Sequence, residues 1–203
     1  MRLTDYTHLL WEPLIPKEAT IIDATCGAGH DTLFLAKRAR KLIAYDIQED
    51  ALDQTRLQLK SLPSSAHVEL RLACHSAINE PAHFIVYNLG YLPGADKNIS
   101  TKIDTTHLSI QKALKWIEPG CWISLMCYSG HPAGEIETES LLKFCSELNQ
   151  KEFSVHLHRL LNGCLAPQTL LIQKSKNWTD EVKRSTDNTA LSSCKPPIES
   201  ALN

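Results

Sequence analysis

The sequence lacks the cysteine and histidine spacing of a disulfide-bonded or metal-binding domain. Its seven cysteines are odd in number, lie far apart and form no Cys-x-x-Cys pair. Neither a disulfide framework nor a structural zinc site is therefore expected. The histidines show no metal-ligand spacing with one another, so we expect no metal. A reducing, cytoplasmic location is the simplest inference.

Four further features are absent. No apolar run approaches the length of a membrane span, and the first residues do not combine a basic region with a long apolar stretch, so neither a membrane segment nor a secretion signal is expected. Charge of one sign is not in excess, because 21 Lys+Arg stand against 23 Asp+Glu. This balance excludes a strongly basic coat protein for nucleic acid, but not an enzyme with a local basic patch. Internal repeats are also absent.

What is present is an alternation of strand and helix patterns, which predicts an α/β fold with a doubly wound, seven-stranded sheet. Strands are expected at 19–25, 41–47, 67–72, 83–89 and 121–128. Helices are expected at 30–38, 49–61, 135–149, and from a cap at Asp104 or Thr105 to Ile117, where Pro119-Gly120 follows. The last two strands, 155–161 and 169–173, are expected to be antiparallel because no helix-length segment separates them. Residues 1–175 then form the domain, and the polar segment 176–203 is expected to be a flexible tail.

A glycine turn follows the first expected strand. Ligands of doubly wound sheets bind at the carboxyl ends of the strands, and Gly27 and Gly29 let a ligand approach the backbone. The helix that begins at His30 or Asp31 offers free N–H groups. Asp46 ends the second strand, where a carboxylate can accept both hydroxyls of a ribose. The glycines alone fit a merely tight turn equally well; Asp46 favours ligand binding.

The acids near this turn suit a cationic cofactor. A dinucleotide site requires Gly-x-Gly-x-x-Gly, and Thr32 stands at the third glycine position. Asp31 and Asp23 would be unfavourable beside a pyrophosphate, but they suit the sulfonium and amino group of S-adenosylmethionine. Cys74 and His75 follow the third strand, where adenine contacts are expected; the alternative for His75 is a surface or loop histidine.

The segment after the fourth strand reads Asn88-Leu89-Gly90-Tyr91-Leu92-Pro93-Gly94. Amine-methylating enzymes often place Asn/Asp-Pro-Pro-aromatic there, so that the side-chain oxygen and a backbone carbonyl accept the N–H bonds of the amine and orient its lone pair. This chain keeps the amide and the aromatic ring without the prolines, and a structural turn is the alternative. His131, after the fifth strand, could assist deprotonation or bind substrate, or be an ordinary loop histidine.

Several segments together resemble the MnmM-like class I S-adenosylmethionine-dependent methyltransferases, a family long labelled rRNA methylases. They are the segments 23–32, 46–48, 88–94, 128–132 and 162–167. The resemblance implies a Rossmann-like class I methyltransferase fold. It also implies methyl transfer to the exocyclic amine of 5-aminomethyl-2-thiouridine at the tRNA wobble position, giving 5-methylaminomethyl-2-thiouridine.

Three sets of site residues are expected, carried over by motif from the resemblance except for His131 and Tyr128, which are candidates by their position after the fifth strand. The cofactor contacts are Cys26, Gly27, Ala28, Gly29, His30, Asp31, Asp46, Gln48, Cys74 and His75. The catalytic candidates are Asn88 and His131. The substrate contacts are Leu89, Gly90, Tyr91, Pro93, Lys97, Lys102 and Tyr128. Among these, Tyr91 and Tyr128 are available to stack on a splayed base, and the two lysines could contact phosphates of the anticodon stem-loop, with salt-sensitive affinity.

Alternatives stay open at this point. The acceptor could be rRNA or a small-molecule amine. The chain could also bind S-adenosylmethionine without catalysis, because Ala28 stands where many relatives have Asn and Cys74 where Ser is usual. The sequence leaves open whether the chain forms a homodimer.

Overall fold

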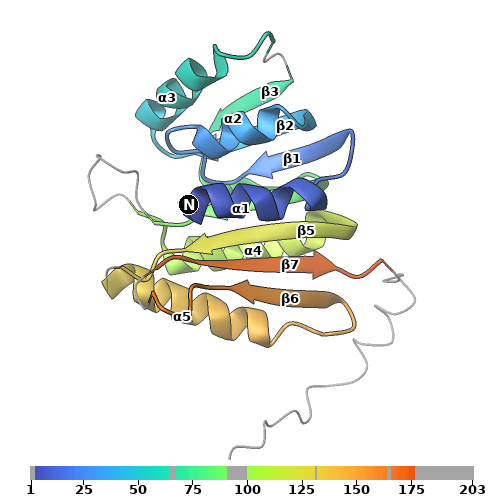
Figure 1. Ribbon diagram of the computed structural model, residues 1–203, viewed down its shortest axis with the longest axis vertical. Coiled ribbons are helices and arrows are strands. Elements are labelled where there is room, and N and C mark those ends of the chain that lie inside the picture. The colour runs from blue at the N-terminus through green and yellow to red at the C-terminus, as the bar shows by residue number, and fades with distance from the viewer. Residues whose placement is uncertain (1–2, 65–66, 91–99, 131, 164–165, 177–203) are drawn as a thin grey trace, which may run out of the picture.

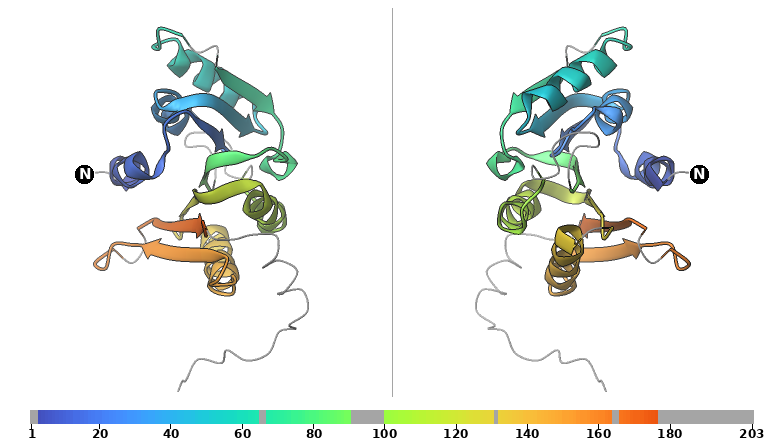
Figure 2. Two further views of the ribbon diagram at one scale, coloured as in Figure 1. Left: turned by 90° about the vertical axis from the view of Figure 1, so that its right-hand side faces the viewer. Right: turned by 90° about the vertical axis from the view of Figure 1, so that its left-hand side faces the viewer.

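The computed structural model describes residues 3–64, 67–90, 100–130, 132–163 and 166–176. They form a single seven-stranded sheet with helices on both faces (Figures 1 and 2). The strands are β1 (Ala19–Asp23), β2 (Ala39–Asp46), β3 (Val68–Leu72), β4 (Ala82–Asn88), β5 (Ile117–Cys127), β6 (Phe153–His158) and β7 (Gln168–Lys174). The helices are α1 (Leu3–Trp11), α2 (His30–Ala36), α3 (Glu49–Leu59), α4 (Ile103–Trp116) and α5 (Pro132–Ser146), with short 3-10 turns η1 (Glu12–Leu14) and η2 (His75–Ala77).

The strand order is β3-β2-β1-β4-β5-β7-β6. Strands β1 to β5 are parallel, whereas β7 runs antiparallel to β5 and to β6. The predicted doubly wound sheet and its antiparallel C-terminal pair are therefore confirmed. β1 lies between β2 and β4, so the chain order reverses beside its carboxyl end, where open α/β sheets bind ligands.

Two apolar layers hold the helices on the sheet. On one face, Trp11 of α1 and Leu35 of α2 pack against Ile21, Phe84 and Val86, and α3 covers the β2 side of the same face through Leu52 and Ala44. On the other face, α4 and α5 bury one stripe each against β4 and β5. This second layer includes Ile85, Tyr87, Ile110, Ile123 and Leu141. Strands buried on both faces explain the continuous apolar runs of the sequence.

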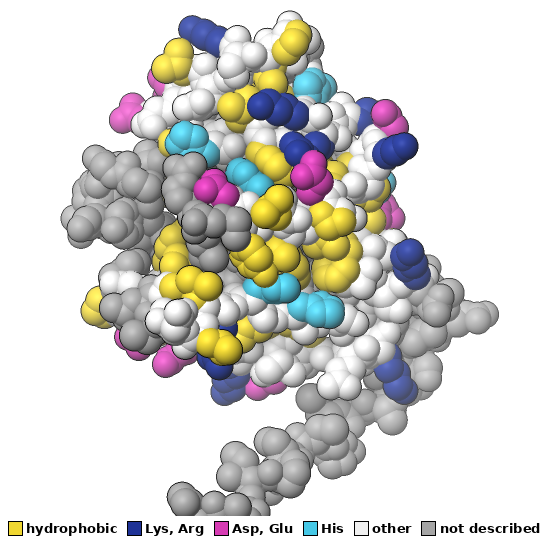
Figure 3. Space-filling view, in the orientation of Figure 1, with side chains coloured by type: hydrophobic (Ala, Val, Ile, Leu, Met, Phe, Trp, Pro, Cys, Tyr) yellow, Lys and Arg dark blue, Asp and Glu magenta, His cyan; other side chains and the backbone are white. Residues whose placement is uncertain are grey.

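The α1 face of β7 and β6 has no helix over it among the described residues (Figures 1 and 2). Hydrophobic side chains and histidines are visible on this side in the space-filling view (Figure 3). The rings of Trp122 and His156 lie 5.6 Å apart, and those of Tyr6 and His158 6.5 Å apart. Aromatic pairs thus cover part of the sheet that α1 leaves open.

Three details differ from the sequence analysis. Helix α1 was not predicted at all. The predicted cap of α4 is wrong, because Lys102 occupies the N-cap position and Thr105 lies in the first turn, where its hydroxyl donates to the Lys102 carbonyl at 3.0 Å. Pro119-Gly120 lies within β5, where the pairing with β4 skips residues between Ile117 and Trp122; the positive φ of Gly120, 83°, permits this irregularity.

The predicted tail, 176–203, lies outside the described residues except for Lys176. Across the described part of the chain, none of the helices has both the length and the apolar character that a bilayer crossing requires.

Candidate active site

The glycine turn between β1 and α2 is closed by contacts with three neighbouring elements. The Ala24 N–H donates to the Val86 carbonyl at 2.8 Å, and the Cys26 N–H to the Tyr45 carbonyl at 2.9 Å. From α3, the Thr55 hydroxyl donates to the Gly27 carbonyl at 3.1 Å. Gly29 ends the turn with φ 84°, a left-handed conformation that disfavours other residues. The turn is therefore rigid, with its backbone at the carboxyl edge of the sheet.

Asp46 joins this turn to the start of α3. Its Oδ2 accepts the Gly27 N–H and its Oδ1 accepts the Gln48 N–H, each at 3.0 Å. An ionised carboxylate offers about four acceptor positions, so Asp46 keeps capacity for two further donors. The predicted position at the end of β2 is confirmed, and the chemistry fits a ribose diol.

Asp23 lies buried beneath the turn. It accepts the Thr32 hydroxyl at 2.6 Å and the Thr25 N–H at 3.3 Å. Burial, followed by the charges of Asp31 and Asp46, raises the pKa of Asp23 to about 7, against the two hydrogen bonds, which lower it. Three carboxylates thus surround the turn, and a cation bound there would relieve their mutual repulsion.

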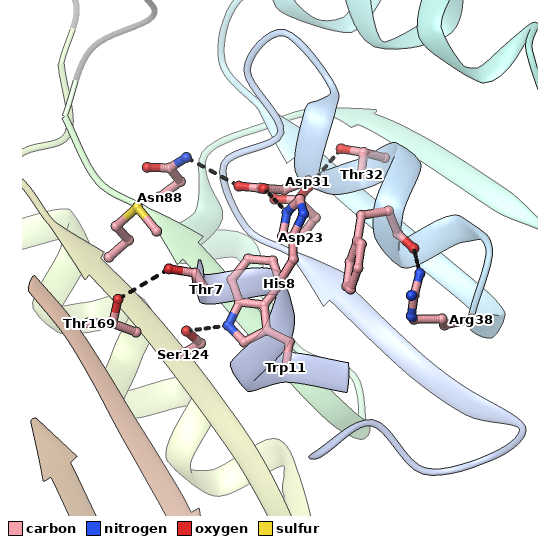
Figure 4. A network of polar contacts seen from close by, with 12 residues as sticks. Thr7, His8, Trp11, Asp23, Asp31, Thr32, Arg38, Asn88, Ser124 and Thr169 are labelled. Atoms are coloured by element: carbon pink, nitrogen blue, oxygen red, sulfur yellow. Dashed lines mark hydrogen bonds and ion pairs between the residues drawn. The ribbon is translucent and has the colours of Figure 1, made fainter. Parts of the chain in front are cut away.

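Asp31 links the start of α2 to two other elements (Figure 4). Its Oδ1 lies 2.6 Å from Nε2 of His8 on α1, and its Oδ2 accepts the side-chain N–H of Asn88 at 3.2 Å. The Asn88 backbone N–H also donates to the Thr25 hydroxyl at 2.7 Å. The structure therefore brings Asn88 and the glycine turn together, as predicted. His8 was missed because a lone histidine on an unpredicted helix carries no local signal.

Tyr128 lies beside Asn88 at the end of β5. Burial, followed by the charge of Asp31, raises its pKa to about 12, while its contact with Asn88 lowers it. The Tyr128 hydroxyl donates to the sulfur of Met126 at 3.0 Å. A Cβ on Gly90 would lie 4.0 Å from the Tyr128 ring, so the ring lies against the backbone that follows β4.

Gly90 and Thr101 enclose the segment 91–99. The Thr101 N–H donates to the Gly90 carbonyl and the Gly90 N–H donates to the Thr101 hydroxyl, both at 2.9 Å. The buried Glu137 of α5 accepts the hydroxyls of Thr101 and Thr106, each at 2.8 Å. Lys102 is exposed at the N-cap of α4. Four predicted residues, Tyr91, Pro93, Lys97 and His131, lie outside the described residues.

Cys74 and His75 follow β3 and form the start of η2. Cys74 accepts the Ser76 hydroxyl at 3.2 Å through its sulfur. His75 is buried against the edge of the Tyr87 ring, and burial lowers its pKa to about 4. Its Nε2 has no hydrogen-bond partner among the residues that the structure describes. A surface histidine is therefore the wrong interpretation of His75, which is neutral and packed beneath α4. No group of three or more His, Cys, Asp or Glu within the described ranges could hold a metal ion.

The fold and the arrangement of these residues define a class I S-adenosylmethionine-dependent methyltransferase. Solved structures with the same topology support this class. A Streptococcus mutans methyltransferase in complex with SAH superposes with a TM-score of 0.77 and 35% sequence identity, over 86% of this chain and 98% of that one. The protein from Clostridium thermocellum described as "putative rRNA-methylase" superposes with a TM-score of 0.80 and 31% identity, over the same shares of the two chains.

The sequence defines the family more closely. The model of the family described as "Putative rRNA methylase" matches residues 42–174. The tRNA (mnm(5)s(2)U34)-methyltransferase, chloroplastic, of Arabidopsis thaliana is 36% identical over 193 residues, which cover 87% of this chain and 70% of that protein. The chain belongs to this methylase family, and the resemblance inferred from the sequence is confirmed.

Proposed function

We propose that this protein transfers a methyl group from S-adenosylmethionine to the exocyclic amine of 5-aminomethyl-2-thiouridine at the wobble position of tRNA, giving 5-methylaminomethyl-2-thiouridine. The name of the Arabidopsis relative supports this substrate. The observation that carries the proposal is the position of Asn88. Its amide lies beside the glycine turn, with its N–H bound to Asp31, as expected for a residue that receives an amine.

The residues at the carboxyl edge fit the cofactor. We infer that the turn Cys26–Asp31 lies along it, that Asp46 accepts its ribose hydroxyls beside Gln48, and that Cys74 and His75 flank its adenine. S-adenosylmethionine supplies an electrophilic methyl group carried on a sulfonium. Asp23, Asp31 and Asp46 lie close enough for their charges to interact, which favours a cationic ligand over a pyrophosphate.

The acceptor nucleotide would lie on the β4 side of the turn. Asn88 Oδ1 and the Leu89 carbonyl accept the N–H bonds of the amine, which holds the nitrogen in line for transfer. An aminomethyl group is cationic when protonated, so the nearby carboxylates attract it more than they attract a neutral base nitrogen. The proposed nucleotide contacts are Gly90, Tyr91, Pro93 and Tyr128, with Lys97 and Lys102 on phosphates of the anticodon stem-loop and His131 as a proton acceptor or substrate contact.

The test is nucleoside mass analysis after incubation of the protein and S-adenosylmethionine with tRNA that carries 5-aminomethyl-2-thiouridine. We expect 5-methylaminomethyl-2-thiouridine to form, and neither ribosomal RNA nor free alkyl amines to be methylated at a comparable rate. Asn88→Ala should abolish conversion while cofactor binding persists. Asn149→Ala is the matched control, because Asn149 is exposed beyond the distal end of α5. Methylation of ribosomal RNA in place of tRNA would overturn the proposal.

A further inference from the structure

Three elements meet at the carboxylate of Asp31. His8 of α1 contacts Oδ1 at 2.6 Å, and Asn88 at the end of β4 donates to Oδ2 at 3.2 Å (Figure 4). Asp31 itself lies in the first turn of α2 and is only 8% exposed. We propose that His8 and Asp31 are positioning residues that determine which end of the Asn88 amide faces the methyl-accepting amine. This inference rests on the proposed function and extends it to the N-terminal helix.

The direction of the Asn88 amide follows from the chemistry of its partner. An ionised carboxylate can only accept hydrogen bonds, so Asn88 must turn its NH2 group toward Asp31. The amide is planar, and its oxygen then lies on the side away from Asp31, as Figure 4 shows. An amine has N–H bonds to donate, and only the amide oxygen can accept them. With the amide reversed, its NH2 group would face the N–H bonds of the amine, so two donors would oppose each other and the amine would have no acceptor on Asn88.

His8 holds the Asp31 carboxylate in the orientation that keeps the NH2 group of Asn88 directed at it. Its ring stacks on Phe34 of α2, with centroids 4.0 Å apart and an interplanar angle of 15°. The ring therefore has little freedom, and its Nε2 must carry a hydrogen to face an ionised carboxylate. One fixed donor on Oδ1 restrains rotation of the carboxylate, so Oδ2 stays directed at Asn88.

Helix α1 is itself anchored to the sheet, which makes His8 a stable reference point. The indole N–H of the buried Trp11 donates to the Ser124 hydroxyl of β5 at 2.8 Å. A second contact joins η1 to the residues just after α2 at the surface, where Arg38 pairs with Glu12 at 2.7 Å. If the only role of His8 were to hold α1 against α2, loss of the His8–Asp31 contact and loss of the Arg38–Glu12 ion pair would have similar consequences.

Substitutions at His8 separate an orienting role, through its hydrogen bond to Asp31, from a merely structural role in packing α1 against α2. His8→Phe keeps a ring to stack on Phe34 but removes the donor, whereas His8→Gln keeps an N–H near the position of Nε2. With tRNA bearing 5-aminomethyl-2-thiouridine, we expect His8→Phe to lower kcat/KM by about tenfold or more, without a change in cofactor affinity or melting temperature. His8→Gln should recover most of the activity. Glu12→Gln, which removes only the charge of the surface ion pair with Arg38, should match the wild type.

A measurement independent of turnover completes the test. The side-chain NH2 resonances of Asn88 in the NMR spectrum should shift and broaden in Asp31→Asn and in His8→Phe, and stay near their wild-type positions in His8→Gln and Glu12→Gln. Wild-type resonances and wild-type kcat/KM in His8→Phe would overturn the inference, as would a His8→Gln variant as impaired as His8→Phe. If the wild-type protein itself fails to methylate this tRNA, the proposed function is wrong, and the resonances alone decide whether His8 and Asp31 orient the amide.

Discussion

Thr55 of α3 occupies the space that a side chain on Gly29 would need. A Cβ added to Gly29 would lie 2.7 Å from the Thr55 Cα and 2.8 Å from its hydroxyl oxygen. Contact with backbone at this distance forces the turn and α3 apart. The glycine therefore sets how closely α3 approaches the cofactor side of the sheet.

Gly29→Ala should destabilise the protein and weaken its binding of S-adenosylmethionine. The substitution combines a close contact with a φ of 84°, and we expect a loss of about 1–3 kcal/mol in the free energy of unfolding. Denaturant unfolding measures the loss. Gly130→Ala is the matched control, because no atom of the described residues lies within 4 Å of a Cβ there. Equal stability of the two variants would contradict the packing argument.

Asp46→Ala should reduce the affinity for S-adenosylmethionine by about tenfold or more, because it removes a charge-assisted acceptor and the partner of the Gly27 N–H. Calorimetric titration measures the affinity. Asp50→Ala, which removes an exposed carboxylate in the first turn of α3, should leave it within a few-fold of the wild type. Undiminished binding by Asp46→Ala would place the ribose elsewhere.

The raised pKa of Asp23 predicts a pH-dependent stability. Its pKa moves from 3.8 to about 7 on folding, so the folded protein binds more protons than the unfolded chain between these values. The free energy of unfolding should therefore fall as pH rises from about 4 to 7, by at most about 1.4 kcal/mol per pH unit from this group. Asp23→Asn should remove this dependence and be the more stable form at pH 8. Thermal unfolding of the cofactor-free protein at pH 5 and pH 8 is the measurement; a variant less stable than the wild type at pH 8 would show that the charge is tolerated.

Trp11→Phe should detach α1 from β5 and cost about 1–3 kcal/mol, because it leaves the buried Ser124 hydroxyl without the indole donor. Trp116→Phe is the control, since that side chain is 39% exposed and its loss should change the free energy of unfolding by much less. The comparison requires only equilibrium unfolding. Similar losses at both positions would argue against the Trp11–Ser124 anchor.

The strands and the glycine turn were predictable because their signals are local. Apolar runs of strand length and the position of Asp46 depend on residues that are neighbours in the sequence. Helix α1 was missed because nine residues make a helix that is marginal on its own; its stability comes from tertiary contacts such as Trp11 with Ser124. The contact of His8 with Asp31 has the same origin, since 23 residues separate the partners.

A second limit of prediction from the sequence is visible at Pro119-Gly120 and at His75. A Pro-Gly pair marks a break in regular structure, but only the pairing with β4 reveals that the break is an irregularity inside β5. His75 is polar and follows a strand, so its sequence context predicts exposure. Burial beneath α4 depends on helix packing, which no pattern within η2 encodes.

The paired hydrogen bonds of Gly90 and Thr101, held in turn by Glu137, have an evolutionary consequence. The chain leaves β4 and returns to α4 through one fixed junction. Insertions, deletions or exchanges between these two residues can accumulate without shifting the register of β4. The proposed function assigns nucleotide contacts to this stretch, so on that proposal we expect acceptor preference to change among descendants while the turn between β1 and α2 is inherited unchanged.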